Sequence, residues 1–188
     1  MAKSIMIVGV GGQGTLLASR ILGNTVIRRG YDVKVSEVHG MSQRGGSVVT
    51  YVKYGEKVYS PCIDKGEADI ILAFELLEAA RALPFLKKDG KIIVNTQQIN
   101  PMSVITGAME YPAELDKKLE SKANITKLNA VELATKAGNI KSVNVVLIGV
   151  LAKESDIPYE EWIKSINETV PPKFLDVNLK AFELGYNL

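Results

Sequence analysis

The amino-acid sequence predicts an α/β fold, a Rossmann-like and mostly parallel sheet with helices on both faces. Short apolar runs of strand length alternate with longer segments whose apolar residues recur at helical spacing. A cluster of glycines separates the first run from the first helical segment, and the C-terminal third shows mainly helical patterns. We expect one domain over residues 1–188, because this length is within the usual range for a single core.

The first half of the chain predicts two strands, a helix between them and an inserted β-hairpin. A buried parallel strand is expected at residues 4–10, a second, alternating strand at 32–38, and the helix at about 13–29 with Gly30 suited to end it. Residues 47–53 and 57–60 alternate in strand fashion around Tyr54-Gly55-Glu56. This pattern predicts an antiparallel hairpin inside the α/β order.

The second half resumes the alternation and then becomes helical. Strands are expected at residues 69–74, 91–95 and about 124–128, with a turn at Lys88-Asp89-Gly90 before the second of these. Helices are expected at residues 76–86, 130–137, 142–153, 159–169 and 172–184. The last three of these helices form the helical C-terminal third.

Charge and cysteine content narrow the classes of function. Lys and Arg number 23 against 21 Asp and Glu, which is too balanced for the basic face of a protein that binds nucleic acid through phosphates. The apolar runs are shorter than the roughly 20 residues that a membrane-spanning helix needs, and no secretory signal pattern is present, so we expect a cytoplasmic protein without a membrane partner. With one cysteine, Cys62, and one histidine, His39, we expect no metal or iron–sulfur site made by this chain alone.

The glycine cluster has the G-x-G-x-x-G spacing of a phosphate-binding loop. It reads Gly9-Val10-Gly11-Gly12-Gln13-Gly14 and lies between a predicted strand and a predicted helix, where backbone amides favour an anion. Glu37, near the end of the second strand, could imitate the acid that binds an NAD ribose. The glycines could instead serve only the turn and close packing, or receive a partner's backbone, and the pattern alone leaves these alternatives open.

A second glycine-rich segment follows the second strand and predicts a functional loop. It contains His39, Met41, Ser42, Gln43, Arg44, Gly45 and Gly46. In an open α/β sheet, ligands and partners usually meet the chain at the carboxyl ends of the strands. His39 could transfer protons near neutral pH, but no recognisable partner makes a self-contained catalytic site with it. A solvated turn is the alternative explanation for this segment.

Four segments together resemble the gamma-type domain of the 2-oxoacid:ferredoxin oxidoreductase family, and the resemblance covers nearly the whole chain. They are Val8-Gly9-Val10-Gly11-Gly12-Gln13-Gly14, Glu37-Val38-His39-Gly40-Met41-Ser42-Gln43-Arg44-Gly45-Gly46, Pro171-Pro172-Lys173, and Asn178-Leu179-Lys180-Ala181-Phe182-Glu183-Leu184-Gly185-Tyr186. The second is the decisive one, because its form resembles the beta subunits of the indolepyruvate:ferredoxin oxidoreductases within this family.

The resemblance implies a division of labour between two chains. A large alpha subunit would hold thiamine diphosphate, magnesium and [4Fe–4S] clusters. The complex would oxidatively decarboxylate arylpyruvates such as indolepyruvate to acyl-CoA, with coenzyme A as co-substrate and ferredoxin as electron acceptor. The present chain would be inactive alone. The resemblance assigns it no catalytic residue, so residues 39–46 enter as an interface or substrate-side element and residues 9–14 as a phosphate or partner loop.

Two other classes of function compete with this one. The first is an independent NAD-binding dehydrogenase that uses Gly9, Gly11, Gly14 and Glu37. The second is a nucleotide or acyl-CoA binding module that uses the same glycine loop. The dehydrogenase lacks a recognisable acid–base constellation for hydride transfer and leaves the segment from His39 to Gly46 unexplained, so we rank it below the oxidoreductase subunit.

Overall fold

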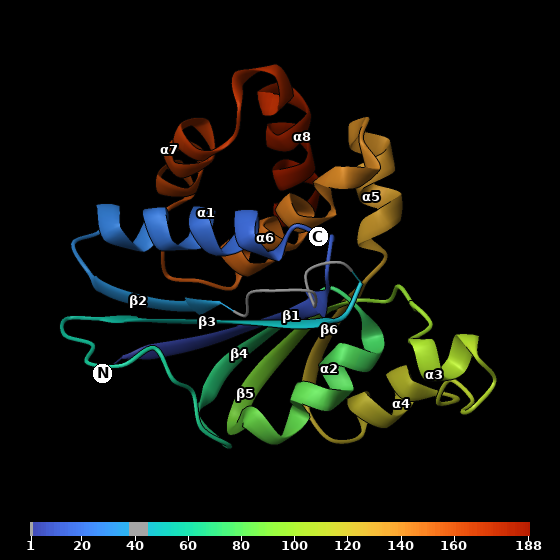
Figure 1. Cartoon of the computed structure of the whole chain (residues 1–188). Helices are drawn as coiled ribbons and strands as arrows, with labels where there is room; N and C mark the ends of the chain where they lie inside the picture. Colours follow the sequence, from blue (N-terminus) through green and yellow to red (C-terminus); the bar gives the residue numbers. More distant parts are fainter. Residues whose placement is uncertain (1, 38–44) are drawn as a thin grey trace.

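The structure is a computed structural model that describes residues 2–37 and 45–188. Its sheet has six strands in the order β2-β3-β1-β4-β5-β6 (Figure 1). The strands are β1 Lys3–Val10, β2 Asp32–Glu37, β3 Ser47–Gly55, β4 Ala68–Ala73, β5 Leu86–Asn95 and β6 Asn124–Leu128. Strands β1, β4, β5 and β6 pair in parallel, while β3 is antiparallel to both of its neighbours, β1 and β2. The predicted mostly parallel sheet is confirmed.

Helices cover both faces of this sheet, as predicted. They are α1 Thr15–Arg28, α2 Leu76–Ala82, α3 Met102–Ile105, α4 Leu115–Glu120, α5 Ala130–Ala137, α6 Val143–Lys153, α7 Tyr159–Thr169 and α8 Leu175–Tyr186, with 3-10 turns η2 Leu83–Phe85, η3 Ile140–Ser142 and η4 Pro172–Phe174. Helices α1, α5, α6, α7 and α8 share one apolar core with the sheet, and α2 and α4 share the other (Figure 1). The alternation of strand side chains supplies both cores, since Ile5 and Ile7 face one and Met6 and Val8 the other.

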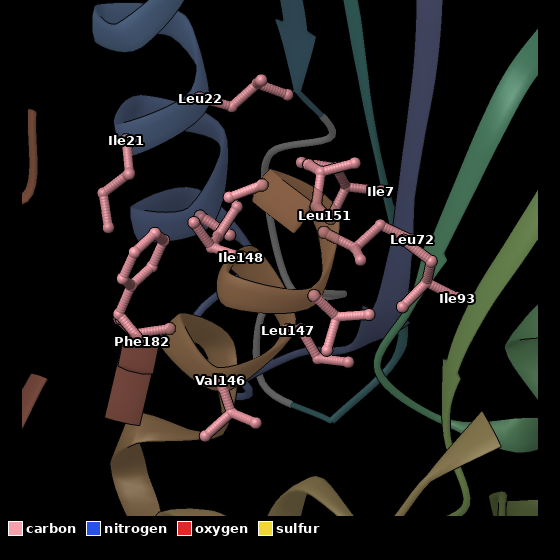
Figure 2. Packing of buried hydrophobic residues seen from close by; sticks show 14 of the residues in the cluster. Ile7, Ile21, Leu22, Leu72, Ile93, Val146, Leu147, Ile148, Leu151 and Phe182 are labelled. Atoms are coloured by element: carbon pink, nitrogen blue, oxygen red, sulfur yellow. The ribbon is translucent and has the colours of Figure 1, made fainter. Parts of the chain in front are cut away.

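The larger core is organised around α6, which is buried from Val143 to Ala152. Figure 2 shows Leu147 and Leu151 of this helix directed toward the strand residues Ile7, Leu72 and Ile93. A helix of 11 residues in which only Asn144 and Lys153 are polar is a core helix of a globular fold. No helix in the described part of the chain has the length and apolarity needed to cross a bilayer.

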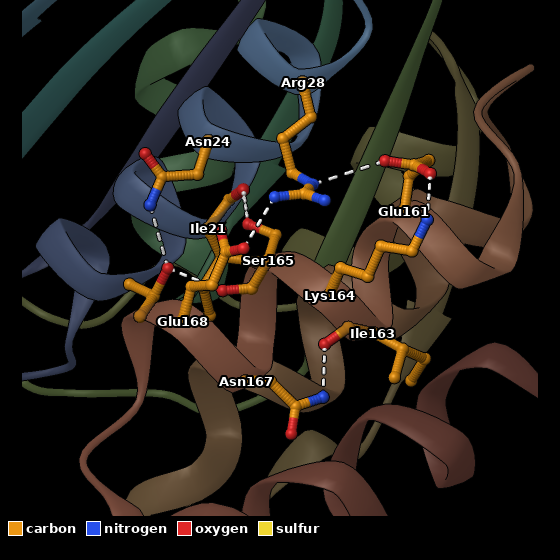
Figure 3. A network of polar contacts seen from close by, with 10 residues as sticks. Ile21, Asn24, Arg28, Glu161, Ile163, Lys164, Ser165, Asn167 and Glu168 are labelled. Carbon is orange, nitrogen blue, oxygen red and sulfur yellow. Dashed lines mark hydrogen bonds and ion pairs between the residues drawn. The ribbon is translucent and has the colours of Figure 1, made fainter.

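Helix α1, which carries the glycine loop at its start, is held in place by polar contacts from α7 (Figure 3). The Ser165 hydroxyl donates to the Ile21 carbonyl oxygen at 2.8 Å, and this bond is buried. Arg28, at the other end of α1, pairs with Glu161 at 3.3 Å and Glu168 at 2.6 Å. The C-terminal helices therefore fix the direction in which α1 presents its N-terminus.

The predicted hairpin of residues 47–53 and 57–60 is wrong in its second strand. Residues 47–55 do form an antiparallel strand, but residues 57–60 form none. Both edges of β3 are already occupied, by β2 on one side and β1 on the other, so no edge remains for a third partner. Instead, the Val58 amide donates to the Asp32 carboxylate at 2.9 Å, which holds this segment against the start of β2.

Two boundaries between residues 76 and 95 also differ from the prediction. Helix α2 ends at Ala82, and the tight turn η2 at Pro84 replaces its expected last turn, because proline lacks the amide that an α-helix needs. The predicted turn at residues 88–90 lies inside β5, where the pairing with β4 jumps from Leu86 to Lys91. The short helices α3 and α4 lie in a stretch for which the sequence indicated no element.

Candidate functional site

The glycine loop of residues 11–14 leaves the carboxyl end of β1, as the motif predicts. Gly12 and Gly14 adopt left-handed backbone angles, with φ of 98° and 84°, which glycine adopts without strain. Gly9 does not take part in the turn, since it lies within β1. A Cβ atom there would come within 2.9 Å of both Gln13 Oε1 and Phe74 Cβ, so Gly9 permits close approach and Gly12 makes the turn.

The side chain of Gln13 folds back and ties this loop to the neighbouring strand ends. Its Oε1 accepts from the Val10 amide at 2.7 Å, and its Nε2 donates to the Phe74 carbonyl at 3.0 Å and to Gln97 Oε1 at 3.2 Å. The buried Asn95 side chain donates to the same Phe74 carbonyl at 3.0 Å. Gln13 thus works as a structural clamp across β1, β4 and β5, and both of its polar atoms are engaged within the fold.

The start of α1 is the part of the loop that could bind an anion. Gly14 occupies the N-cap position and offers no side-chain cap, and the first turn carries no acidic residue. Helix N-termini of this kind attract negative charge. Asn144 of α6 donates to the Gly14 carbonyl at 3.1 Å, and a Cβ at Gly14 would come within 2.6 Å of the Asn144 Nδ2 atom. Gly14 is therefore required both by its backbone angle and by its contact with α6.

Two cavities flank the glycine loop. One, of about 270 Å³, is lined by Gly11, Gly12, Gly14, Thr15, Leu16, Val48 and Thr50. The other, of about 400 Å³, is lined by Gly12, Gln13, Gly14, Gln97, Val131, Ile140, Lys141 and Val143. Among the described residues that line these two cavities, Lys141 is the only basic one, and it gives the second cavity a positive charge that a phosphate or carboxylate would meet.

The structure brings the end of the second predicted segment to the glycine loop. The Gly11 amide donates to the Gly46 carbonyl oxygen at 2.8 Å, and Gly45 has a left-handed φ of 100°. Gly45 and Gly46 therefore lie beside the loop at the carboxyl end of β1. The other predicted residues of this segment, His39, Met41, Ser42, Gln43 and Arg44, lie outside the described residues.

Two buried acids at the start of α2 anchor this edge of the sheet and carry roles that the sequence does not reveal. Glu75, 1% exposed, accepts from the Glu78 amide through one oxygen and from the Tyr111 hydroxyl and the Ile99 amide through the other. Burial and the bond to Glu75 raise the pKa of Tyr111 above its ordinary value. Glu78 accepts from the Ser47 hydroxyl at the start of β3 and pairs with Arg81. Pairs of acidic residues at helical spacing are common on protein surfaces, so the sequence positions of Glu75 and Glu78 do not show that both are buried anchors.

The position of Glu37 disfavours the dinucleotide interpretation. In a dinucleotide-binding fold, the ribose acid ends the strand beside β1. Here β3 lies between β2 and β1. Glu37 therefore ends a strand that is two strand spacings, about 10 Å, from β1 instead of one. Its carboxylate accepts a 2.8 Å hydrogen bond from the Ser19 hydroxyl of α1. The glycine loop and Glu37 therefore do not face one ligand in the way that NAD binding requires.

Comparison with known proteins decides the family. The sequence model of the pyruvate ferredoxin/flavodoxin oxidoreductase family matches residues 4–188. The chain belongs to this family. It is 48% identical over 188 residues to the indolepyruvate oxidoreductase subunit IorB of Thermococcus kodakarensis, an alignment that covers 97% of this chain and 93% of that protein. The resemblance seen in the motifs is confirmed, and the chain is a small subunit of a multi-subunit oxidoreductase of this family.

Solved structures agree on the family's fold. The gamma subunit of a keto/oxoacid ferredoxin oxidoreductase from Geobacter sulfurreducens is 23% identical, with a TM-score of 0.73 and coverage of 98% of this chain and 96% of that one. A 2-oxoglutarate:ferredoxin oxidoreductase from Magnetococcus marinus is 17% identical with a TM-score of 0.76, and it covers 99% of this chain but only 30% of its own. The same fold therefore occurs both as a separate subunit and as part of a larger chain.

Proposed function

We propose that this chain is the small subunit of an indolepyruvate:ferredoxin oxidoreductase that depends on thiamine diphosphate. The single observation that carries the proposal is the 48% identity to a curated indolepyruvate oxidoreductase subunit over 97% of the chain. The complex would oxidatively decarboxylate arylpyruvates to acyl-CoA with coenzyme A as co-substrate. A related solved enzyme, which acts on 2-oxoglutarate, holds coenzyme A and succinyl-CoA, in support of this class of reaction.

The reactive groups of this enzyme would reside on a large partner subunit. One exposed cysteine, Cys62, is too few for a [4Fe–4S] cluster, whose irons are held by four cysteines. The partner would therefore hold thiamine diphosphate, magnesium and the iron–sulfur clusters, and it would pass electrons to ferredoxin. The thiamine group supplies the carbanion chemistry of decarboxylation when it is bound. The contribution of this chain would be to complete and shape the site.

Within this division, the loop of residues 39–46 would face the partner's active site. The bond between the Gly11 amide and the Gly46 carbonyl supports the proposal, because it fixes one end of this loop beside the glycine loop. Arg44 would hold a carboxylate or a phosphate in two hydrogen bonds, which its planar guanidinium allows and a lysine does not. The glycine loop, clamped by Gln13, would act as the rigid base for this contact.

Reconstitution tests the proposed function. The purified chain should be colourless and inactive, and mixing it with the large subunit should give arylpyruvate-dependent reduction of a viologen dye. Parallel assays with indolepyruvate, pyruvate and 2-oxoglutarate identify the substrate class. A preference for pyruvate or 2-oxoglutarate would reject the indolepyruvate assignment and keep the family, whereas turnover by this chain alone would reject the division of labour.

A further inference from the structure

Residues 96–109, in the connection between β5 and α4, form an uncharged stretch at the carboxyl edge of the sheet. None of these fourteen residues is charged, whereas roughly three would be at the chain's average of 23%. Met102, Ile105 and Met109 are 69%, 65% and 65% exposed. We call these three side chains the apolar knob. Large apolar side chains gathered on one exposed segment mark interaction sites.

The knob is compact. Met102 and Ile105 are three residues apart in α3 and so share one side of that short helix. The Met109 amide then donates to the Ser103 carbonyl at 2.9 Å, which folds the chain back onto α3. In Figure 1, α3 projects from the body of the molecule beside α4. The three side chains therefore belong to one projection and are not scattered over the surface.

The segment that carries the knob is also fixed at both ends by hydrogen bonds to the start of α2. The buried Glu75 carboxylate accepts from the Ile99 amide at 3.0 Å and from the Tyr111 hydroxyl at 2.6 Å, so both ends of the projecting segment are fixed to the start of α2. The Leu76 amide adds a bond to the Gln97 carbonyl at 3.1 Å. A segment fixed in this way loses little conformational entropy when a partner covers it, which favours binding.

Composition and position identify the kind of partner. The cores of protein interfaces are depleted in charge and enriched in methionine, and the knob has both properties. The segment that carries the knob begins beside the glycine loop, because Gln97 Oε1 accepts from Gln13 at 3.2 Å, so the segment and the loop lie on one edge of the sheet. The chain is a small subunit of a multi-subunit oxidoreductase, and its fold also makes up 30% of a larger oxidoreductase chain, so another part of this enzyme is the partner that the comparisons indicate.

We propose that Met102, Ile105 and Met109 insert into an apolar recess of the large subunit and form the centre of the subunit interface. The proposal rests on the proposed function, because it takes the large subunit as the occupant. It adds a surface that neither the glycine loop nor the loop of residues 39–46 includes.

Binding of the full-length chain to the large subunit tests this proposal. A fluorophore on Cys62, which is exposed and the only cysteine, reports assembly by anisotropy. Ile105→Glu and Met109→Glu should each raise the dissociation constant by about ten-fold or more, as expected for the centre of an interface. Ile27→Glu is the matched control, since Ile27 is 57% exposed on α1, and it should change the constant by less than about two-fold. Melting curves of the free variants should match the parent chain, because all three sites are exposed.

The outcomes separate the possible failures. If Ile105→Glu and Met109→Glu bind like the parent chain, the knob is not the interface and the proposal is overturned. If they instead dissociate a homodimer of the free chain and leave assembly unchanged, the occupant is a second copy and the proposal is likewise overturned. If the parent chain itself does not bind the large subunit, the proposed function is rejected, and this inference, which depends on it, is rejected as well.

Discussion

The Tyr111 hydroxyl donates a 2.6 Å hydrogen bond to the Glu75 carboxylate, 36 residues earlier in the chain. This bond joins the end of the projecting segment 99–111 to the N-cap residue of α2. Glu75 also accepts from two backbone amides, so its buried charge is satisfied by three donors. Glu75 thus has a structural role, because it holds together the segments at the carboxyl edge of the sheet.

The first prediction concerns this acid. Glu75→Leu leaves three donors without an acceptor and should lower the free energy of unfolding by about 3–5 kcal/mol, whereas Glu75→Gln keeps one acceptor oxygen and should cost about 1–3 kcal/mol. Urea unfolding measures both values, and Glu110→Gln, at an exposed position, is the control. Equal stability of Glu75→Leu and the parent chain would contradict the anchoring role.

The second prediction is a loss of stability at alkaline pH. Burial raises the pKa of Tyr54 from 10 to about 12, and burial with the Glu75 bond raises the pKa of Tyr111. Both tyrosines therefore keep their protons longer in the folded state. Their contribution to stability is complete below pH 10, where the unfolded chain is also protonated, and is lost as the pH rises from 10 toward the folded pKa values.

Urea midpoints measured between about pH 8 and pH 11 test this sign. The double variant Tyr54→Phe and Tyr111→Phe should show a shallower decline above about pH 10 than the parent chain. Tyr59→Phe, at a side chain that is 89% exposed, should leave the decline unchanged. Identical declines in the parent chain and the double variant would show that neither tyrosine is responsible.

The third prediction tests the clamp formed by Gln13. In Gln13→Glu, a carboxylate oxygen replaces the Nε2 donor and meets two acceptors, the Phe74 carbonyl and Gln97 Oε1. The variant should be less stable by about 1–3 kcal/mol. Gln98→Glu, an exposed change of the same chemistry, should alter stability by less than about 0.5 kcal/mol. Thermal or urea unfolding gives both values. Equal stability of Gln13→Glu and the parent chain would show that Gln13 does not act as a clamp.

The fourth prediction concerns Arg44. If Arg44 binds the partner, Arg44→Ala should weaken assembly; if it binds a 2-oxoacid or coenzyme A, assembly should survive while kcat or KM worsens. Arg44→Lys should also be impaired, since lysine offers only a point charge. Steady-state kinetics and the assembly assay on the same preparations distinguish these roles. Normal assembly with unchanged kinetics in Arg44→Ala would mean that the segment is a solvated turn.

The fifth prediction is that NAD and NADP do not bind at the glycine loop. The inserted β3 and the bond from Ser19 keep Glu37 away from the ribose position. Titration calorimetry should detect no binding in the micromolar range, which corresponds to about −8 kcal/mol. A micromolar dissociation constant that is lost in Glu37→Ala would instead favour a dehydrogenase.

The sequence predicted the elements that a strong local pattern specifies. The strands around Ile7 and Ile71 are near-continuous apolar runs, and α6 is too apolar to be anything but buried. The partner of β3 was not predictable in the same way, because alternation indicates a strand but not its neighbours. Residues 57–60 alternate too, yet both edges of β3, their predicted hairpin partner, are occupied by β1 and β2.

The candidate site was predicted only where backbone chemistry decides it. Gly12 and Gly14 could be found from the motif because left-handed angles favour glycine. Gln13 belongs to the predicted loop, but its role as a clamp and the roles of Glu75 and Tyr111 were not predictable, because they come from contacts between distant segments. The apolar knob lies in a stretch whose helices have four and six residues, too short to give a helical period.

The central claim, that this chain completes a two-subunit oxidoreductase, is tested most directly by titration of the chain into the purified large subunit under anaerobic conditions. The rate of indolepyruvate-dependent ferredoxin reduction should rise with added chain and saturate at a fixed molar ratio of the two subunits. A rate that is independent of this chain, with the large subunit fully active alone, would contradict the claim.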